Sequence, residues 1–190
     1  MEKIVIIGPS GAGKTTLARE LGFLLKIKVF HLDRLFWLRG WKRKTRDTRT
    51  DILQNLVLRD KRWIIEGTYL NSSKQHLNIA DTIIFLDISP LLCFQRLIKR
   101  HREYYRRSRR DIPEGCTDKL TLLRILKVLI FPLRGRRTII RKLRNYNSKQ
   151  IIWLHSAKEV EDFLVRLVQV VDEKDVSSPA KQRLSVTTGR

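Results

Sequence analysis

The chain has 190 residues, 42% of them hydrophobic, and a formal net charge of +21. This length and hydrophobic content predict one globular domain with a substantial core. The most hydrophobic stretch, residues 120–133, contains two basic residues and a proline and is shorter than the ~20 apolar residues of a membrane span. Cys93 and Cys116 fit no zinc-binding pattern. We therefore expect a soluble, cytoplasmic protein that makes no contact with a membrane.

The positive charge exceeds what a nucleotide site alone requires, so it indicates a polyanionic partner. Basic residues are concentrated in two stretches, 96–110 and 134–144. Such clusters are typical of an arginine-rich lid over nucleotide phosphates and also of a surface that binds nucleic acid. The two interpretations are compatible, and the composition leaves both open.

The first predicted elements are a strand at residues 4–7 and a phosphate-binding loop directly after it. Residues 8–15 match G-x-x-x-x-G-K-[ST] without a gap, and a helical pattern follows. In such a loop, Lys14 reaches the β- and γ-phosphates of ATP and the Thr15 hydroxyl is a ligand of Mg²⁺. The start of the following helix favours the same anion. The predicted ATP-binding residues of this segment are Gly8, Pro9, Ser10, Gly11, Ala12, Gly13, Lys14, Thr15 and Thr16.

Short β-branched runs and helical patterns alternate along the rest of the chain. Further strands are predicted at residues 28–31, 63–65, 82–86 and 150–154. This alternation predicts a three-layer α/β fold, with a parallel five-stranded sheet, helices on both faces and ligands at the carboxyl ends of the strands.

The helix boundaries also have sequence signals. Ser89 and Pro90 predict the start of a long basic helix, and Ser156 with Glu159 predicts a capping box for the last one. Residues 1–172 are expected to form the single domain. Residues 173–190 have the composition of a flexible tail.

Acidic residues follow three of the predicted strands, where ligands are expected. Asp33 and Glu66 are candidates because a kinase requires carboxylates for Mg²⁺ and for the acceptor hydroxyl. We expect Asp33 to bind the acceptor, and Glu66 to join Thr15 at the metal. The alternatives are that Asp33 is a helix N-cap, that Glu66 is an ordinary loop residue, and that Asp87 only caps the turn before the basic helix. His31 is expected to be a packing residue.

Arg96 and Arg100 are separated by one helical turn, so they share a helix face. Two guanidinium groups in this arrangement can neutralise a polyphosphate, although a solvated basic face has the same pattern. Phe36, Trp37 and Trp41 lie in the segment expected to flank the acceptor. They are candidates either for stacking on an acceptor base or for the core.

Several segments together resemble the adenylate-kinase-like "DNA topology modulation" proteins of bacteria. They are residues 8–15, 31–37 with Gly40-Trp41, 63–69, 80–87, and Glu114-Gly115-Cys116 with Phe131-Pro132. The resemblance covers about residues 1–171. It implies a nucleoside-monophosphate-kinase fold with strand order 2-3-1-4-5, an ATP site at the phosphate-binding loop, and a lid at about residues 100–119. Arg96 and Arg100 would then be the arginines at the base of the lid that contact the nucleotide.

These observations predict a Mg-ATP-dependent phosphotransferase whose small-molecule acceptor is a nucleoside or nucleotide. The predicted catalytic residues are Lys14, Asp33, Glu66, Arg96 and Arg100, with Arg96 also binding ATP. One alternative is an ATP-binding regulator that contacts DNA non-specifically through its basic clusters. Another is a kinase of a non-nucleotide metabolite, similar to shikimate and gluconate kinases, in which Asp33 holds substrate hydroxyls. The direction of the arginines, toward the loop or outward, discriminates the kinases from the DNA-binding regulator.

Overall fold

The computed structural model describes residues 1–67, 75–104, 112–113, 116 and 120–176. Its centre is a five-stranded sheet in which all neighbours are parallel. The strands lie in the order β2 (Val29–His31), β5 (Trp63–Glu66), β1 (Lys3–Ile7), β6 (Thr82–Leu86) and β7 (Gln150–Leu154). Counted along the chain within this sheet, the order is 2-3-1-4-5, as expected. The five predicted strands are present, each within one residue of its predicted bounds.

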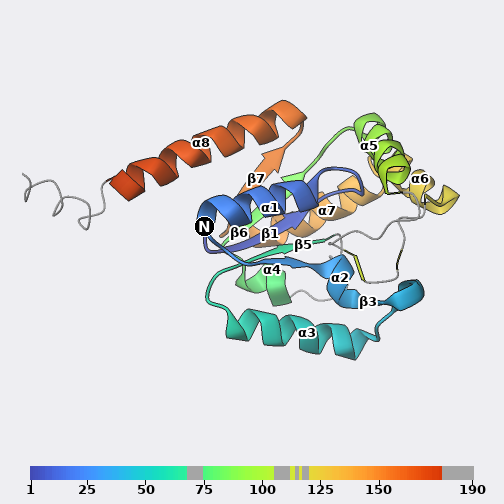
Figure 1. The fold of residues 1–190 in the computed structure, drawn as a ribbon, viewed down its shortest axis with the longest axis horizontal. Coiled ribbons are helices and arrows are strands. Elements are labelled where there is room, and N and C mark those ends of the chain that lie inside the picture. The colour runs from blue at the N-terminus through green and yellow to red at the C-terminus, as the bar shows by residue number, and fades with distance from the viewer. Residues whose placement is uncertain (68–74, 105–111, 114–115, 117–119, 177–190) are drawn as a thin grey trace, which may run out of the picture.

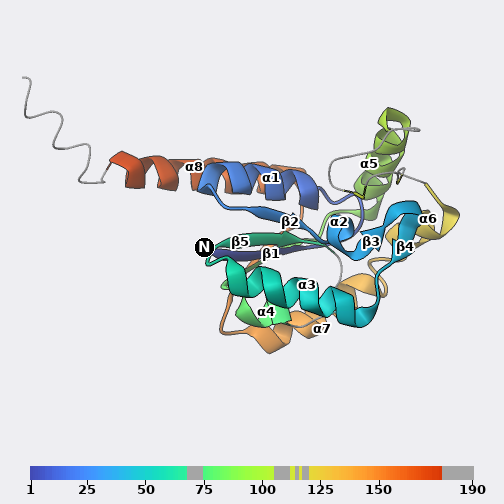
Figure 2. The same ribbon diagram turned by 60° about the horizontal axis from the view of Figure 1, so that its bottom comes forward.

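Helices cover both faces of the sheet. The helices α1 (Lys14–Leu25) and α8 (Ala157–Val176) lie on one face, and α3 (Arg46–Arg59), α4 (Gln75–Ile79) and α7 (Gly135–Leu143) lie on the other (Figures 1 and 2). The helices α5 (Pro90–Glu103) and α6 (Leu122–Leu129) stand side by side beyond the carboxyl ends of the strands (Figure 1). Short 3₁₀ turns lie at Arg39–Trp41 and Arg144–Tyr146.

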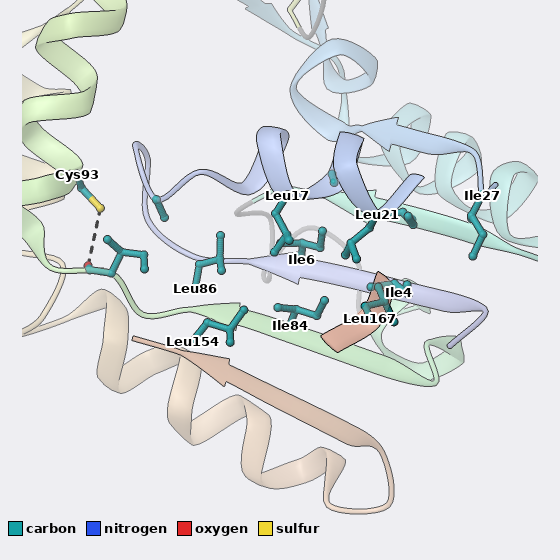
Figure 3. Packing of buried hydrophobic residues seen from close by; sticks show 14 of the residues in the cluster. Ile4, Ile6, Leu17, Leu21, Ile27, Ile84, Leu86, Cys93, Leu154 and Leu167 are labelled. Carbon is teal, nitrogen blue, oxygen red and sulfur yellow. Dashed lines mark hydrogen bonds between the residues drawn. The ribbon is translucent and has the colours of Figure 1, made fainter. Parts of the chain in front are cut away.

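The central strand β1 shows why the sheet has a core on each side. Side chains alternate along a strand, so Ile4 and Ile6 face α1 while Val5 and Ile7 face the opposite layer. All four are almost fully buried. Figure 3 shows Ile4 and Ile6 packed beneath Leu17 and Leu21 of α1. A strand that is covered on both faces has a continuous hydrophobic sequence, and β1 has one.

The predicted caps are present with one difference in geometry. The Ser89 hydroxyl accepts a hydrogen bond from the Leu92 amide, and Pro90 begins α5. The Ser156 hydroxyl accepts a hydrogen bond from the Glu159 amide. The Glu159 carboxylate, however, accepts from the amide of His155, one residue earlier than in the standard capping box.

The C-terminal end of the domain differs from its predicted bound. Helix α8 continues to Val176, so the predicted tail boundary after residue 172 is too early. The cause is that the apolar periodicity fades before the helix ends. Residues 177–190 and most of the predicted lid, at 105–111, 114–115 and 117–119, lie outside the described residues. Within the described chain, no helix combines the length and apolar character needed to cross a bilayer.

A small antiparallel hairpin, which the sequence did not predict, follows β2 and the short helix α2 (Leu32–Phe36). It consists of β3 (Trp37–Leu38) and β4 (Lys42–Arg43). The Lys44 amide donates a hydrogen bond of 2.9 Å to the Phe36 carbonyl and closes the hairpin. Gly40 and Trp41, at its tip, both have left-handed backbone conformations.

Candidate functional site

The carboxyl ends of β2 and β5 and the loop after β1 open onto a cleft of about 1580 Å³. Pockets for one small ligand are usually ~300–1,000 Å³, so this open cleft is larger than one small ligand requires. It contains all five predicted catalytic residues, namely Lys14, Asp33, Glu66, Arg96 and Arg100. Residues 10–16 of the predicted ATP site also line it, whereas Gly8 and Pro9 do not.

The phosphate-binding loop has the conformation that its glycines allow. Gly8 and Gly11 have φ angles of +150° and +86°, which L-residues rarely adopt. A Cβ on Gly11 would lie 2.4 Å from the Cys93 carbonyl oxygen, and one on Gly8 would lie 2.6 Å from that of Leu86. The loop therefore requires glycine at both positions for its close approach to β6 and α5.

Lys14, within the phosphate-binding motif, is the first residue of α1, and its side chain is partly buried. The ammonium group donates a hydrogen bond of 2.8 Å to the Pro9 carbonyl oxygen. Burial lowers the pKa of Lys14, the nearby carboxylates of Glu66 and Asp33 oppose this by raising it, and Arg100 lowers it further. An anion bound near the Lys14 ammonium would favour its charged form.

Glu66 is the last residue of β5, so the interpretation as an ordinary loop residue is wrong. Its buried carboxylate accepts a hydrogen bond of 3.2 Å from the Thr15 hydroxyl. The same oxygen lies 2.9 Å from Nδ1 of His31, which acts as the donor because a carboxylate only accepts. The oxygens of Thr15 and Glu66 are the hard ligands that Mg²⁺ prefers, and their proximity fits a metal site beside the loop.

The positions of His31 and Asp33 differ from two sequence interpretations. His31 is the N-cap residue of α2 and Asp33 is the second residue of that helix, so the interpretation of Asp33 as an N-cap is wrong. Asp33 lines the cleft near Lys14. His31 lines the same cleft and orients Glu66, so its role is not packing alone. A signal for this contact was available only from the sheet, in which His31 and Glu66 are register partners on adjacent strands.

Three arginines approach the phosphate-binding loop from outside the sheet. The Arg96 guanidinium donates a hydrogen bond of 3.2 Å to the Ala12 carbonyl oxygen, and Arg100 lines the cleft one turn further along α5. Arg124 of α6 donates a bond of 3.4 Å to the Ser10 hydroxyl. Sequence reasoning missed Arg124, because it lies in a hydrophobic stretch with no motif. Arg96 of α5 and Arg124 of α6 therefore converge on the loop.

Asp87 has a different environment from the two carboxylates of the cleft. Its carboxylate accepts a hydrogen bond of 2.7 Å from Arg136 and lies 3.4 Å from Nδ1 of His155. Ser89, and not Asp87, is the N-cap residue of α5. Asp87 instead ties α7 to the ends of β6 and β7.

The three aromatic residues of the predicted acceptor segment divide between core and cleft. Phe36 is fully buried in the core beneath the sheet, so a stacking role for it is wrong. Trp37 and Trp41 line the cleft, with ring centroids 5.7 Å apart and planes at 77°. Trp41 has a φ of +59°, which is uncommon for a bulky residue. The hairpin thus holds two indole rings at the wall of the cleft opposite the loop.

Comparisons with known proteins show the fold. Neither a family model nor a curated protein sequence matches the chain. The solved shikimate kinase of Acinetobacter baumannii, in complex with shikimate, superposes with a TM-score of 0.58 at 17% identity, covering 92% of this chain and 94% of that one. A shikimate kinase of Bacteroides thetaiotaomicron gives 0.51 at 18% identity, covering 89% and 97%. This chain has the α/β fold of P-loop kinases.

Proposed function

We propose that this protein is a Mg-ATP-dependent kinase that transfers the γ-phosphoryl group to a hydroxyl group of a small molecule. The observation that carries the proposal is that one cleft contains Lys14, Thr15, Glu66 and Asp33. Thr15 is hydrogen-bonded to Glu66, and Asp33 is close enough to Lys14 to raise its pKa. The P-loop kinase fold is consistent with it.

In this proposal the phosphates of ATP occupy the loop at residues 8–15. Lys14 exchanges its contact with the Pro9 carbonyl for the phosphates, and Arg96 and Arg100 neutralise the charge from α5. Thr15 and Glu66 hold Mg²⁺, which supplies further charge neutralisation when bound. Because phosphoryl transfer requires mainly positioning and charge neutralisation, these groups suffice for the ATP side.

The acceptor occupies the remaining part of the cleft, where Asp33 accepts the hydrogen of the attacking hydroxyl. We propose a nucleoside or nucleotide as the acceptor. Trp37 and Trp41 support this, because indole rings at a cleft wall suit a planar base. The resemblance to adenylate-kinase-like proteins supports it as well. The convergence of Arg96 and Arg124 on the loop supports a kinase role for the arginines near the phosphate-binding loop, and does not extend to the exposed arginines of residues 134–144.

An ADP-release assay tests the proposal. The purified protein is given Mg-ATP and a panel of nucleosides, nucleotides and sugar acids, with and without duplex DNA. We expect nucleosides or nucleotides to stimulate ADP release, and Lys14→Ala to abolish the stimulation. Stimulation by sugar acids alone would indicate a metabolite kinase. Stimulation by DNA without any small acceptor would replace the kinase with a DNA-dependent ATPase.

A further inference from the structure

Helix α6 presents a row of leucines to solvent. Leu122, Leu126 and Leu129 are 81%, 48% and 49% exposed, and Leu133 in the following turn is 63% exposed. The first three are spaced i, i+4, i+7, so they share one side of the helix, while Val128 turns into the core. We call these four residues the leucine ridge. A helix that packed in the usual way would bury such a side.

The leucine ridge continues directly into a row of basic side chains. Arg134, Arg137, Arg141 and Arg144 are all exposed, and their spacing places them on one side of α7, whose Ile139 and Leu143 are buried. We call these four residues the arginine stripe. Between residues 119 and 158 the sequence contains no acidic residue, so no neighbour along the chain offsets their charge. Leu133 and Arg134 join the two rows.

This surface is separate from the cleft. The residues of α6 that line the cleft are Leu123, Arg124 and Lys127, and none of the leucine ridge or the arginine stripe does so. Figures 1 and 2 place α6 at the end of the molecule, with α7 running back from it under the sheet. The proposed kinase activity therefore leaves both the exposed leucines and this part of the excess charge unexplained.

We propose that the leucine ridge and the arginine stripe together dock the protein on the surface of an anionic lipid bilayer. Leucines of an amphipathic helix enter the boundary between headgroups and acyl chains, and arginines bind the lipid phosphates at the surface of the same leaflet. The earlier expectation of no membrane contact rested on the length of the hydrophobic stretch. That length excludes a spanning helix but not an interfacial one.

Two other occupants fit only half of this surface. Nucleic acid would satisfy the arginine stripe through its phosphates, but its backbone offers no apolar partner for four leucines. A second copy of the chain would cover the leucine ridge, but the chain has a net charge of +21 and so offers the arginine stripe no excess of anionic groups. An anionic bilayer matches both rows at once.

Vesicle sedimentation with the full-length protein tests the proposal, and it needs no ATP, so it is independent of the kinase. The vesicles are phosphatidylcholine alone and phosphatidylcholine mixed with phosphatidylglycerol, at low and high salt. We expect binding to the anionic vesicles only. Leu126→Ser with Leu129→Ser should weaken it about tenfold or more, through lost apolar burial. Arg137→Gln with Arg141→Gln should weaken it by about fivefold per arginine at low salt, and less at high salt.

Matched controls lie on other helices. Phe23→Ser removes an apolar side chain that is 84% exposed on α1, and Arg46→Gln with Arg59→Gln removes two exposed charges on α3. Neither should change vesicle binding. Circular dichroism checks the fold, and a pair of alanines replaces the serines if that variant unfolds.

Three results would overturn the proposal. The first is the absence of binding to anionic vesicles. The second is wild-type vesicle binding by the leucine variant, combined with loss of duplex DNA binding by the arginine variant, which would assign the surface to nucleic acid. The third is a change of the leucine variant from dimer to monomer in sedimentation velocity with unchanged vesicle binding, which would assign the ridge to a second copy.

Discussion

The two walls of the cleft are built in different ways. The phosphate-binding loop is pressed against backbone, with the carbonyls of Leu86 and Cys93 within 3 Å of where Cβ atoms on Gly8 and Gly11 would lie. The opposite wall, at residues 31–41, stands on a two-stranded hairpin, and a Cβ at Gly40 would meet nothing within 4 Å. The loop backbone therefore has no space for added side chains, because it contacts β6 and α5, whereas the hairpin wall has space for one at Gly40. We expect the ATP site to tolerate few substitutions and the acceptor wall to tolerate more.

Gly11→Ala should produce the largest effect and tests this contrast most directly. The new Cβ would clash with backbone, and the φ of +86° would be strained, so we expect ATP binding to be lost and the free energy of unfolding to fall by about 2 kcal/mol or more. Gly40→Ala is the matched control, with only the cost of a positive φ, about 1 kcal/mol, and unchanged ATP affinity. Calorimetric titration and urea unfolding measure both. Equal losses in the two variants would remove the distinction between the walls.

Substitutions of Asp33 and Glu66 should affect different steps of the reaction. Asp33→Asn should lower the rate of transfer to the acceptor by about 10²–10⁴-fold while ATP affinity changes little, because Asp33 serves the acceptor. Glu66→Gln should instead raise the Mg²⁺ concentration required for half-maximal activity, because it weakens the oxygen pair with Thr15. Steady-state kinetics over a Mg²⁺ series distinguish them. Small and equal effects would mean that neither residue is in the reaction centre.

Trp41→Leu tests whether the hairpin wall contacts the acceptor. Losing an aromatic contact with a planar acceptor should raise the KM for the acceptor by about tenfold and leave the KM for ATP unchanged. Leu38→Ala is the control, since Leu38 is half exposed in the same hairpin but does not line the cleft. If the Trp41 variant changed the KM for ATP instead, the ring would belong to the nucleotide side.

The smallest expected effect is a change in the stability of Lys14→Met without ATP, separate from its loss of ATP binding. Burial lowers the pKa of Lys14, so the folded protein without ATP holds a proton there less well than the unfolded chain. Stability from this group therefore rises with pH between the lowered pKa and its ordinary value, and is lowest below the lowered pKa. The variant should have a Tm a few degrees higher at neutral pH, and the gain should shrink as the pH rises through that window. Thermal unfolding over a pH series measures it, and a lower Tm at neutral pH would contradict it.

The sequence alone determined the strands, the parallel α/β class and the phosphate-binding loop. These follow from local properties: runs of β-branched residues, the position of Ser89 before Pro90, and glycines where the backbone adopts positive φ angles. The resemblance added the strand order, which the sheet confirms. Properties of this kind depend on neighbouring residues, so they can be predicted without knowledge of contacts between distant parts of the chain.

Only the tertiary structure decided which polar groups meet. The contact of His31 with Glu66 depends on the register between β2 and β5, and the contact of Arg124 with Ser10 depends on the packing of α6 beside α5. The separation of Phe36 in the core from Trp37 at the cleft likewise follows from where α2 ends and the hairpin begins. These contacts join residues far apart in the chain. The spacing of residue types along the sequence does not determine strand register or helix packing, so it could not predict them.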